Sequence, residues 1–473
     1  MSTYLIGIDN GSQSTKVTII DAQGTIHATG KCPLRPNRMP SPGVVEHPDD
    51  DLWDSIGVAC REAMANFSGR KEDIRGIGLC TIRFCRAMLK ADGTLASPVL
   101  SWMDARVSKP YSDHRSEVAW VTTSSGYITA RLTGQFVDTA ANYAGMWPLD
   151  ISTWNWMPDG KEFDSYGYPR EKLFTLVQPG EELGRITAQA SVHTHLPEGL
   201  PVYATANDKA VEALGSGVRQ EGDLLVSLGT YIAGMAIGTH IAVDARDFWT
   251  NYASQPGFYL YESNGIRRGM WTVSWMADVL RTIGNPAESI DESVRHLDRL
   301  AADIPAGCEG LMVLLDWLAP TDHPWRKGAF LGFDGRHNGV HMYRAVLEAI
   351  ALTMRLRVTE MEKELGKSFS RVILSGGGSN SDLVMQIFAD SWGIPALRMR
   401  MNNAVGLGSA MCAGVGSGVF DSFDQAVQHL VRPGAEFAPN SANTQVYTQM
   451  LPIYASLHHA LDPVFTRSAE VFG

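Results

Sequence analysis

Ile8-Asp9-Asn10-Gly11-Ser12-Gln13-Ser14-Thr15-Lys16 ends one apolar stretch of the chain and begins the next, and a shorter version, Val226-Ser227-Leu228-Gly229-Thr230, follows about two hundred residues later. Each copy consists of a β-rich apolar run, a turn of glycine and hydroxyl residues, and a second run with strand-like alternation. This repetition predicts two β-hairpins in similar surroundings.

The turns of these hairpins carry groups that suit phosphate. Glycine permits a tight turn and lets backbone N–H groups approach phosphate oxygens, while Ser12, Ser14 and Thr230 add hydroxyl donors. The first copy has the carboxylate of Asp9 where the second has Ser227, so only the first can hold a metal. One such turn is ordinary turn chemistry. Two copies that face one phosphate chain would suit a magnesium nucleotide.

Length and charge limit the class of protein. A chain of 473 residues exceeds what one core usually supports, so two domains of roughly 200 to 250 residues each are expected. Apolar residues make up 44% and charged residues 19%, a globular composition without a disordered tail. The net charge of −11, without a cluster of lysine or arginine, argues against a nucleic-acid partner and favours a small molecule.

Cysteine spacing and hydropathy predict the compartment. The six cysteines are scattered without a CxxC pair, so neither a zinc site nor a disulfide framework is indicated, and a reducing compartment is expected. No apolar run approaches the ~20 residues that cross a bilayer. A strand beginning near Tyr4 leaves no room for a signal peptide. We therefore expect a cytoplasmic protein without a membrane partner.

Two segments of the first half are candidates for a cleft. The first is the apolar strand predicted over 74–81, which ends just before Arg83, and charged residues in that position often point into a cleft. The second is 100–106, predicted as extended chain with Trp102, Asp104 and Arg106 on one side. That second segment could equally be a surface strand with one salt bridge.

Asp208 lies between the strand predicted over 201–204 and a helix that ends near Gly215. An aspartate at such a position is commonly the helix N-cap. Because Asp208 also precedes the second phosphate turn, it is a candidate general base as well.

A glycine-rich turn follows a third strand. The strand 372–375 runs into three glycines, Gly376 to Gly378, and then into an amphipathic helix. Three glycines could admit a flat ring or a ribose against the backbone, or only a close helix crossing. The long helix predicted over 340–365, which Gly366 ends, carries an apolar stripe typical of core.

Two hairpins and a glycine-rich strand-to-helix turn, spread over two similar halves, resemble the actin, Hsp70 and sugar-kinase superfamily of ATPases. The segment Gly328-Ala329-Phe330-Leu331-Gly332-Phe333, then His341-Met342-Tyr343-Arg344-Ala345-Val346-Leu347-Glu348, is similar to the C-terminal signature of FGGY carbohydrate kinases. Further matches, which extend the resemblance over nearly the whole chain, are Trp102-Met103-Asp104-Ala105-Arg106, Leu132-Thr133-Gly134 and Ala404-Val405-Gly406-Leu407-Gly408-Ser409-Ala410.

The resemblance implies an α/β fold of two actin-like (ribonuclease H-like) domains with an interdomain cleft. Residues 1–218 would form an N-terminal sugar-binding and catalytic domain, and residues 219–473 a C-terminal nucleotide-binding domain. The implied activity is ATP-dependent transfer of the γ-phosphate to a hydroxyl of a small sugar or polyol, of the xylulokinase and glycerol kinase type, in carbohydrate catabolism.

The resemblance also implies a role for each candidate residue. Asp208 would be the base that takes the proton from the sugar hydroxyl, and Asp9 would hold Mg²⁺ through water. Gly11, Ser12, Ser14, Gly229 and Thr230 would contact phosphates; Gly376, Gly377, Gly378 and Asn380 would lie along the adenosine; Arg83, Phe84, Trp102 and Asp104 would line the sugar pocket.

The chain departs from the family pattern at three places. Only the segment 107–131 separates Arg106 from the Leu132-Thr133-Gly134 match, and the family's N-terminal signature is missing there, which could change the pocket wall or an oligomer contact, such as that of a homodimer. Phe84 replaces an acidic residue of glycerol kinases, and Lys209 replaces a glutamine. The Gln-Met-His triplet of xylulokinase-like members is also absent. A polyol, a ketose and an acidic sugar therefore all stay open as substrates.

Two other functions would use the same ATPase core. A nucleotide-dependent chaperone or filament protein would need a peptide-binding domain or a polymerising surface, and the C-terminal signature argues against both. A sugar-sensing regulator would need a DNA-binding segment, yet no helix-turn-helix precedes Tyr4 and the chain is acidic.

Overall fold

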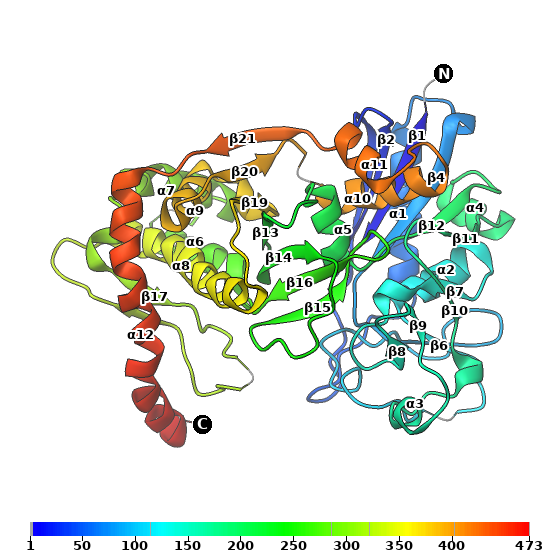
Figure 1. Cartoon of the computed structure of the whole chain (residues 1–473), viewed down its shortest axis with the longest axis horizontal. Coiled ribbons are helices and arrows are strands. Elements are labelled where there is room, and N and C mark those ends of the chain that lie inside the picture. The colour runs from blue at the N-terminus through cyan, green and yellow to red at the C-terminus, as the bar shows by residue number, and fades with distance from the viewer. Residues whose placement is uncertain (1–2, 114, 285, 321, 402, 473) are drawn as a thin grey trace.

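The computed structural model describes residues 3–113, 115–284, 286–320, 322–401 and 403–472. Two large sheets lie side by side, each with its own helices (Figure 1). The N-terminal half is blue to cyan on the right of the view, and the C-terminal half is mainly green to red on the left. The mixed α/β architecture of two similar halves confirms the predicted fold class.

The first sheet has the strand order β11-β12-β4-β1-β2-β3. Its central strand β1 pairs antiparallel with β2 and parallel with β4, and β12 runs parallel to β4. Both faces of β1 are buried, because helices cover the sheet on either side. The strands are β1 (Tyr4–Asn10), β2 (Ser14–Asp21), β3 (Ile26–Pro33), β4 (Ile74–Thr81), β11 (Glu182–Arg185) and β12 (Pro201–Ala204).

The second sheet has the order β15-β16-β14-β13-β19-β20-β21. Its strand β13 pairs antiparallel with β14 and parallel with β19, so β13, β14 and β19 repeat the arrangement of β1, β2 and β4. This repetition confirms the two predicted hairpins. The strands are β13 (Asp223–Leu228), β14 (Ile232–Gly238), β15 (Phe248–Tyr252), β16 (Tyr259–Ser263), β19 (Arg371–Ser375), β20 (Ala396–Met399) and β21 (Pro433–Phe437).

The helices and minor strands fill the space around the two sheets. The helices are α1 (Asp51–Asn66), α2 (Ser124–Thr133), α3 (Lys161–Ser165), α4 (Ala188–Thr194), α5 (Asp208–Gly215), α6 (Gly269–Gly284), α7 (Ile290–Ala301), α8 (Gly339–Leu365), α9 (Asp382–Trp392), α10 (Ala404–Gly416), α11 (Phe423–Leu430) and α12 (Ser441–Phe472). Two-stranded sheets pair β5 (Ala87–Leu89) with β6 (Trp120–Thr122), β7 (Val137–Thr139) with β10 (Thr175–Val177), β8 (Leu149–Asp150) with β9 (Asn155–Trp156), and β17 (Met312–Leu314) with β18 (Ala329–Leu331).

Helix α10 crosses from the second half onto the first sheet. A Cβ atom added at Gly7 of β1 would lie 1.9 Å from the carbonyl oxygen of Gly406, and one at Gly78 of β4 would lie 1.8 Å from that of Ser409. The contact therefore requires glycine in both strands, which gives the 404–410 match a packing reason. Because α10 covers the sheet of the first half, the division of the chain at residue 218 stays a prediction.

Helix α8 carries the core stripe that its sequence predicts. Tyr343, Val346, Ile350 and the apolar residues that follow on this face are buried. Gly366 caps the C-terminus in the left-handed conformation, with φ of 62°, as expected.

The prediction of extended chain over 100–106 is wrong. Leu100 forms single bridges with Glu46 and Arg86, but the residues after Ser101 form consecutive turns. The cause is the Asp104 carboxylate, which accepts hydrogen bonds from the backbone N–H of Arg106 and of Val45 and so folds the segment back on itself.

Within the described residues, no helix is long and apolar enough to cross a membrane.

Candidate active site

The turns of the two hairpins face each other across the boundary between the halves. Gln13 Nε2, in the turn between β1 and β2, donates to Thr230 Oγ1 in the turn between β13 and β14 at 3.4 Å. A Cβ at Gly229 would meet only the Tyr231 carbonyl oxygen, at 3.6 Å, so the backbone of this turn is accessible. The structure thus brings together the two groups of predicted phosphate contacts.

Asp9 lies at the end of β1 with its carboxylate almost completely buried. The Nζ of Lys16 is 3.8 Å from its Oδ2, too far for a strong hydrogen bond. Burial raises the pKa of Asp9 to about 6, and the negative charges of Asp208 and Glu212 act in the same direction. A cation beside Asp9 would relieve this unfavourable burial of charge.

Asp208 is not the N-cap of α5. The cap is Asn207, whose side chain accepts from the backbone N–H groups of Lys209 and Ala210 at 3.1 Å each. Oδ1 of Asp208 is buried and has no hydrogen-bond partner among the described residues, and the Arg83 Nε lies 3.8 Å from it. Burial raises the pKa of Asp208 even though Arg83 is close. The Oδ1 oxygen of Asp208 is therefore an acceptor whose hydrogen-bonding capacity is unused among the described residues, which a general base needs.

Lys209 and Glu212 tie α5 to the second sheet. Lys209 Nζ lies 3.0 Å from Glu212 Oε2 and donates to Ser227 Oγ at 2.8 Å, while Ser375 donates to Glu212 Oε1. Burial opposes ionisation of Glu212, but Lys209 and the serine hydroxyls together lower its pKa. The network holds Asp208, on the first turn of the same helix, in a fixed position.

Arg83 forms a further link between the halves. Its Nη1 and Nη2 donate to the two carboxylate oxygens of Glu262 on β16 at 2.7 and 2.8 Å. The side chain of Arg83 is 14% exposed and that of Glu262 is 1% exposed. Arg83 thus lies at the boundary between the halves, and its place in a sugar pocket stays a prediction.

Two aromatic rings flank this guanidinium. Its Cζ lies 5.1 Å from the ring centre of Phe84 and 5.0 Å from that of Trp249 on β15. Phe84 has φ of 62°, in the left-handed region that non-glycine residues rarely adopt. The strained turn directs Arg83 and Phe84 toward the same space.

The three glycines of the strand-to-helix turn differ in role. Gly376 has φ of +81°, and a Cβ there would lie 2.6 Å from the Leu228 carbonyl oxygen. A Cβ at Gly378 would lie 2.8 Å from the sulfur of Met270. A Cβ at Gly377 would meet nothing within 4 Å. Two of the glycines therefore serve packing, and the third borders open space.

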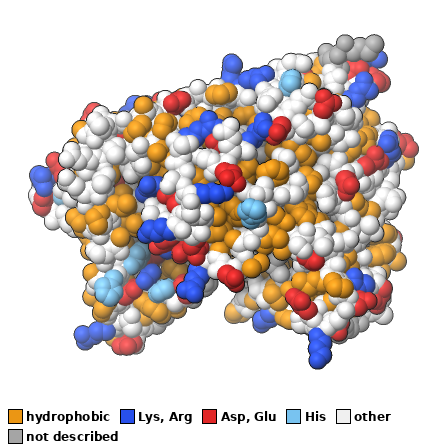
Figure 2. All heavy atoms as spheres, in the orientation of Figure 1, with side chains coloured by type: hydrophobic (Ala, Val, Ile, Leu, Met, Phe, Trp, Pro, Cys, Tyr) orange, Lys and Arg blue, Asp and Glu red, His pale blue; other side chains and the backbone are white. Residues whose placement is uncertain are grey.

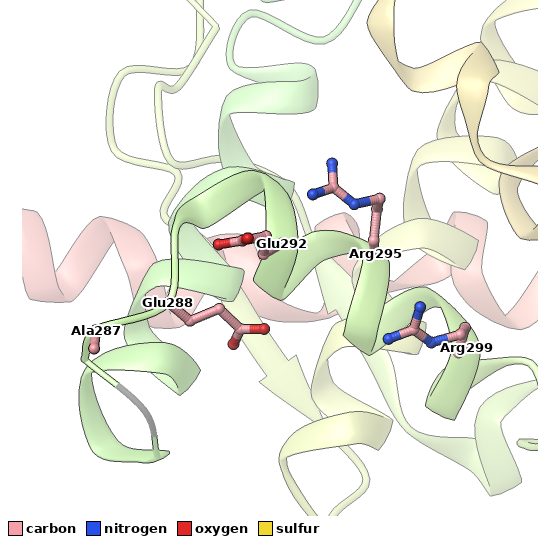
Figure 3. Close-up of a pocket in the computed structure, with 5 residues that line it drawn as sticks. All are labelled: Ala287, Glu288, Glu292, Arg295 and Arg299. Carbon is pink, nitrogen blue, oxygen red and sulfur yellow. The ribbon is translucent and has the colours of Figure 1, made fainter.

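A cavity of about 780 Å³ opens beside this turn, between α7 and α9. Asn380 and Ser381 line it on one side, and Arg295 and Arg299 on the other. Figure 3 shows both arginines on α7 in a neighbouring pocket, which they line together with Glu292. The volume lies within the ~300–1,000 Å³ range of small-molecule sites.

Comparison with protein families identifies the chain. The model of the C-terminal domain of the FGGY family of carbohydrate kinases matches residues 224–417, and that of the N-terminal domain matches residues 4–119 and 107–215. The chain belongs to the FGGY family of carbohydrate kinases. It is therefore a kinase, a phosphotransferase with an alcohol group as acceptor. The chaperone, filament and regulator alternatives are not favoured.

Relatives of this FGGY kinase cover the whole chain. A protein of Escherichia coli strain K12, named uncharacterized sugar kinase YgcE, is 45% identical over 471 residues, 99% of this chain and 96% of its own. The xylulose kinase of Bacillus subtilis is 24% identical and covers 96% of each chain. The crystal structure of xylulose kinase from Rhodospirillum rubrum superposes with a TM-score of 0.84 at 25% identity, over 98% of this chain and 100% of that one.

Two further residues predicted for the sugar pocket, Trp102 and Asp104, lie on the 100–106 loop. Asp104 is buried, and both its oxygens accept hydrogen bonds from Arg106, which lowers its pKa against the effect of burial. Trp102 is 48% exposed. Asp104 thus holds the loop that carries Trp102, and the predicted salt bridge is present within a turn.

Sequence reasoning missed Glu212, Glu262 and Trp249 in this FGGY kinase. Glu212 follows Asp208 by four residues, a spacing that places both on one helix face and could have revealed it. Glu262 is an acid inside an otherwise apolar and aromatic strand, which is also a signal of function. Trp249 gave no signal, because its position depends on the pairing of β15 with β16.

The shortened segment 107–131 of this kinase folds into the first sheet's surroundings. It contains β6, which pairs with β5, and most of α2, which packs in the core of the first half. The effect of the shortening on an oligomer contact stays a prediction.

Proposed function

We propose that this kinase transfers the γ-phosphate of ATP to a hydroxyl of a small sugar or polyol, of the pentulose and polyol class, in carbohydrate catabolism. The observation that carries the proposal is Asp208: one of its carboxylate oxygens is buried, has no hydrogen-bond partner among the described residues and lies close enough to Asp9 of the first hairpin to raise its pKa. The names of the xylulose kinase relatives support a pentulose or a similar compound.

The nucleotide would lie across the two hairpins and along the second half. The contact between Gln13 and Thr230 supports a shared phosphate site, and the open space at Gly377 supports an adenosine site. In this proposal phosphates meet Gly11, Ser12, Ser14, Gly229 and Thr230, and the adenosine meets Gly376, Gly377, Gly378 and Asn380.

Asp9 fits a magnesium ion. It is a buried carboxylate with a raised pKa, and the ion would stabilise its charged form. No group of three or more acidic, histidine or cysteine side chains suited to a metal occurs in the described part of the chain. Mg²⁺ usually takes one or two protein carboxylates and fills its other positions with water and phosphate oxygens. When bound, Mg²⁺ supplies positive charge to the phosphates.

The catalytic step needs one proton acceptor and precise positioning. The acceptor hydroxyl donates its proton to Asp208, and its oxygen forms a bond to the γ-phosphorus. The bond from that phosphorus to the oxygen of the β-phosphate breaks, and ADP leaves. Because burial raises the pKa of Asp208, this carboxylate is a better proton acceptor than an exposed one.

The sugar would occupy the space beside Asp208 that Arg83 and Phe84 face. Trp102 would close the pocket from the 100–106 loop, and Asp104 would position that loop. In this division of labour, residues 1–218 bind sugar and carry the base, and residues 219–473 bind the nucleotide.

The test is ADP formation with Mg²⁺ and ATP over a panel of pentuloses, polyols and aldonates. We expect one compound or a few related ones to give turnover, and Asp208→Asn to remove it. Glu198→Gln is the control, because Glu198 is exposed in the turn before β12 and should be neutral. Failure of every compound with the wild-type protein would contradict the proposal.

A further inference from the structure

We propose that Arg83 and Glu262 act as one recognition unit that selects an acceptor without charge and rejects acidic sugars. The inference rests on the proposed function and specifies its substrate class. Glu262 would be a specificity-determining residue supplied by the second half of the molecule.

The buried cations at the site already have carboxylate partners. Arg83 is bidentate to Glu262, and Lys209 is held by Glu212 and Ser227. Since the charge of each cation is already compensated, a substrate carboxylate would gain a counter-charge only by displacing one of these buried carboxylates from its partner. The displaced carboxylate would then stay in the interior without a counter-charge, which is costly.

The charge that surrounds the acceptor site is mainly negative. Asp208 interacts electrostatically with the carboxylates of Asp9, Glu212 and Glu262. The cations that face them are Arg83, Lys209 and Lys16, of which Lys16 is half exposed. The γ-phosphate of the nucleotide adds further negative charge. A negative acceptor would therefore be repelled, while a neutral one would not.

The pair of Arg83 and Glu262 leaves hydrogen-bond donors of Arg83 unused. A guanidinium has five N–H donors, of which Glu262 takes two, and the Arg83 Nε is 3.8 Å from Asp208. The side chain of Glu262 is only 1% exposed, so a ligand meets the remaining donors of Arg83, and the acceptor beside them is Asp208 Oδ1. Donors and an acceptor thus lie close together, and a pair of neighbouring hydroxyls, each both donor and acceptor, matches this pattern.

Two aromatic rings hold the Arg83 guanidinium in place. Phe84 and Trp249 lie about the same distance from the Arg83 guanidinium, and their own rings are 5.9 Å apart at 40°. The flanking rings hold the guanidinium plane and give the carbon chain of an acceptor an apolar surface. Because Phe84 belongs to the first half and Trp249 and Glu262 to the second, the unit is complete only when the halves are together.

The experiment compares matched acceptors that share a carbon skeleton: xylitol with xylonate, ribitol with ribonate, and glucitol with gluconate. D-xylulose and D-ribulose extend the neutral set. The measured quantity is kcat/KM for ATP-dependent phosphorylation by wild type, by Glu262→Gln and by the control Glu198→Gln. Glutamine has the shape of glutamate, and the melting temperature of each variant checks that it is folded.

We expect wild type to prefer the neutral member of its best pair by about 100-fold, the range that an unpaired buried charge produces. Glu262→Gln should reduce this preference by about 10-fold, because Arg83 is then free to meet a carboxylate. The control should keep the wild-type preference.

Three results would overturn the inference. Equal or better use of an acid by wild type would contradict neutral selection, and that measurement needs no variant. An unchanged preference in a folded Glu262→Gln variant would remove Glu262 from recognition. No phosphorylation of any compound by wild type would refute the proposed function itself, and the inference with it.

Discussion

Asn207 and Asp208 stand side by side where α5 begins, and only one of them caps the helix. Both residue types are good N-caps, so the sequence alone leaves the choice open. The structure gives the cap to Asn207, and the side chain of Asp208 then remains available for chemistry. The existence of this strand-to-helix turn was predictable, whereas the division of labour within it depends on backbone angles at single residues.

Asp9→Asn should stabilise the protein in the absence of metal. The pKa of Asp9 is raised from 3.8 to about 6, so the folded state pays to keep this carboxylate ionised above pH 6. At about 1.4 kcal/mol per pH unit, removing the charge should raise the free energy of unfolding at pH 8 by up to about 3 kcal/mol. Denaturant unfolding in EDTA measures the effect.

The stability gain of Asp9→Asn should depend on pH. Because the folded pKa lies above the unfolded one, the penalty is present above about pH 6 and disappears as the pH falls toward 4. The gain in Asp9→Asn should therefore shrink over the same range, while Mg²⁺-dependent turnover is lost at every pH. A variant less stable than wild type at pH 8 would show that the Asp9 carboxylate is not under electrostatic strain.

At the scale of elements, different glycines of the turn after β19 serve packing and ligand binding. Gly376→Ala should destabilise the protein by about 2 kcal/mol, because φ is positive there and the Cβ would approach Leu228. Gly377→Ala should change stability by less than about 1 kcal/mol, because its Cβ would face open space.

The same pair of variants tests the nucleotide site. Gly377→Ala should weaken ATP binding, measured by calorimetry, about tenfold if the adenosine lies on this backbone. Wild-type affinity in a folded Gly377→Ala variant would move the adenosine elsewhere in the second half.

The part of α8 that resembles the C-terminal signature of the family should contribute to the stability of the fold. Arg344 and Glu348 form a buried ion pair at 2.8 Å, and Tyr447 of α12 donates to the same carboxylate. Glu348→Gln should cost about 3–5 kcal/mol of folding free energy, because Arg344 stays buried without a counter-charge. The control is Glu182→Gln in the exposed pair with Arg185, where about 1 kcal/mol or less is expected.

Thermal unfolding measures the stability of Glu348→Gln, and activity assays on the protein that stays folded measure its KM values. Together they distinguish a structural role of Glu348 from a role in ligand binding. We expect KM for ATP and for the acceptor to stay near wild type in Glu348→Gln. A large change in KM with little change in stability would assign the signature to ligand binding instead.

The hairpins illustrate what a pattern along the chain can predict. Alternation and turn residues are local, so the two hairpins, β1 with β2 and β13 with β14, could be predicted together with their turns. Glu262 and Trp249 reach the site only through the order β15-β16-β14, a long-range pairing that no local pattern encodes. The prediction for 100–106 failed because the Asp104 side chain competes for backbone N–H groups.

At the scale of the whole molecule, the halves share one hydrophobic core, in which Trp154 packs on Tyr252, and they are further joined by polar links and by α10. Gln13 with Thr230 and Arg83 with Glu262 join the halves directly, and the face in Figure 2 is hollowed at its lower edge between them.

We expect the halves to close on their ligands, because closure excludes water that would otherwise hydrolyse the nucleotide. Small-angle scattering should show a smaller radius of gyration with Mg²⁺, a non-hydrolysable ATP analogue and acceptor together than with either ligand alone. An identical radius of gyration in all states would argue against gating by closure.

The central claim is that Asp208 takes the acceptor proton and has no part in holding the nucleotide. The most direct measurement compares Asp208→Asn with wild type in two quantities, the Kd for ATP and the single-turnover rate of phosphoryl transfer to the best acceptor. The account predicts a Kd within about 3-fold of wild type and a rate lower by at least about 100-fold, the range of general-base contributions. A loss of ATP affinity as large as the loss of rate would contradict it and make Asp208 a structural residue of the nucleotide site.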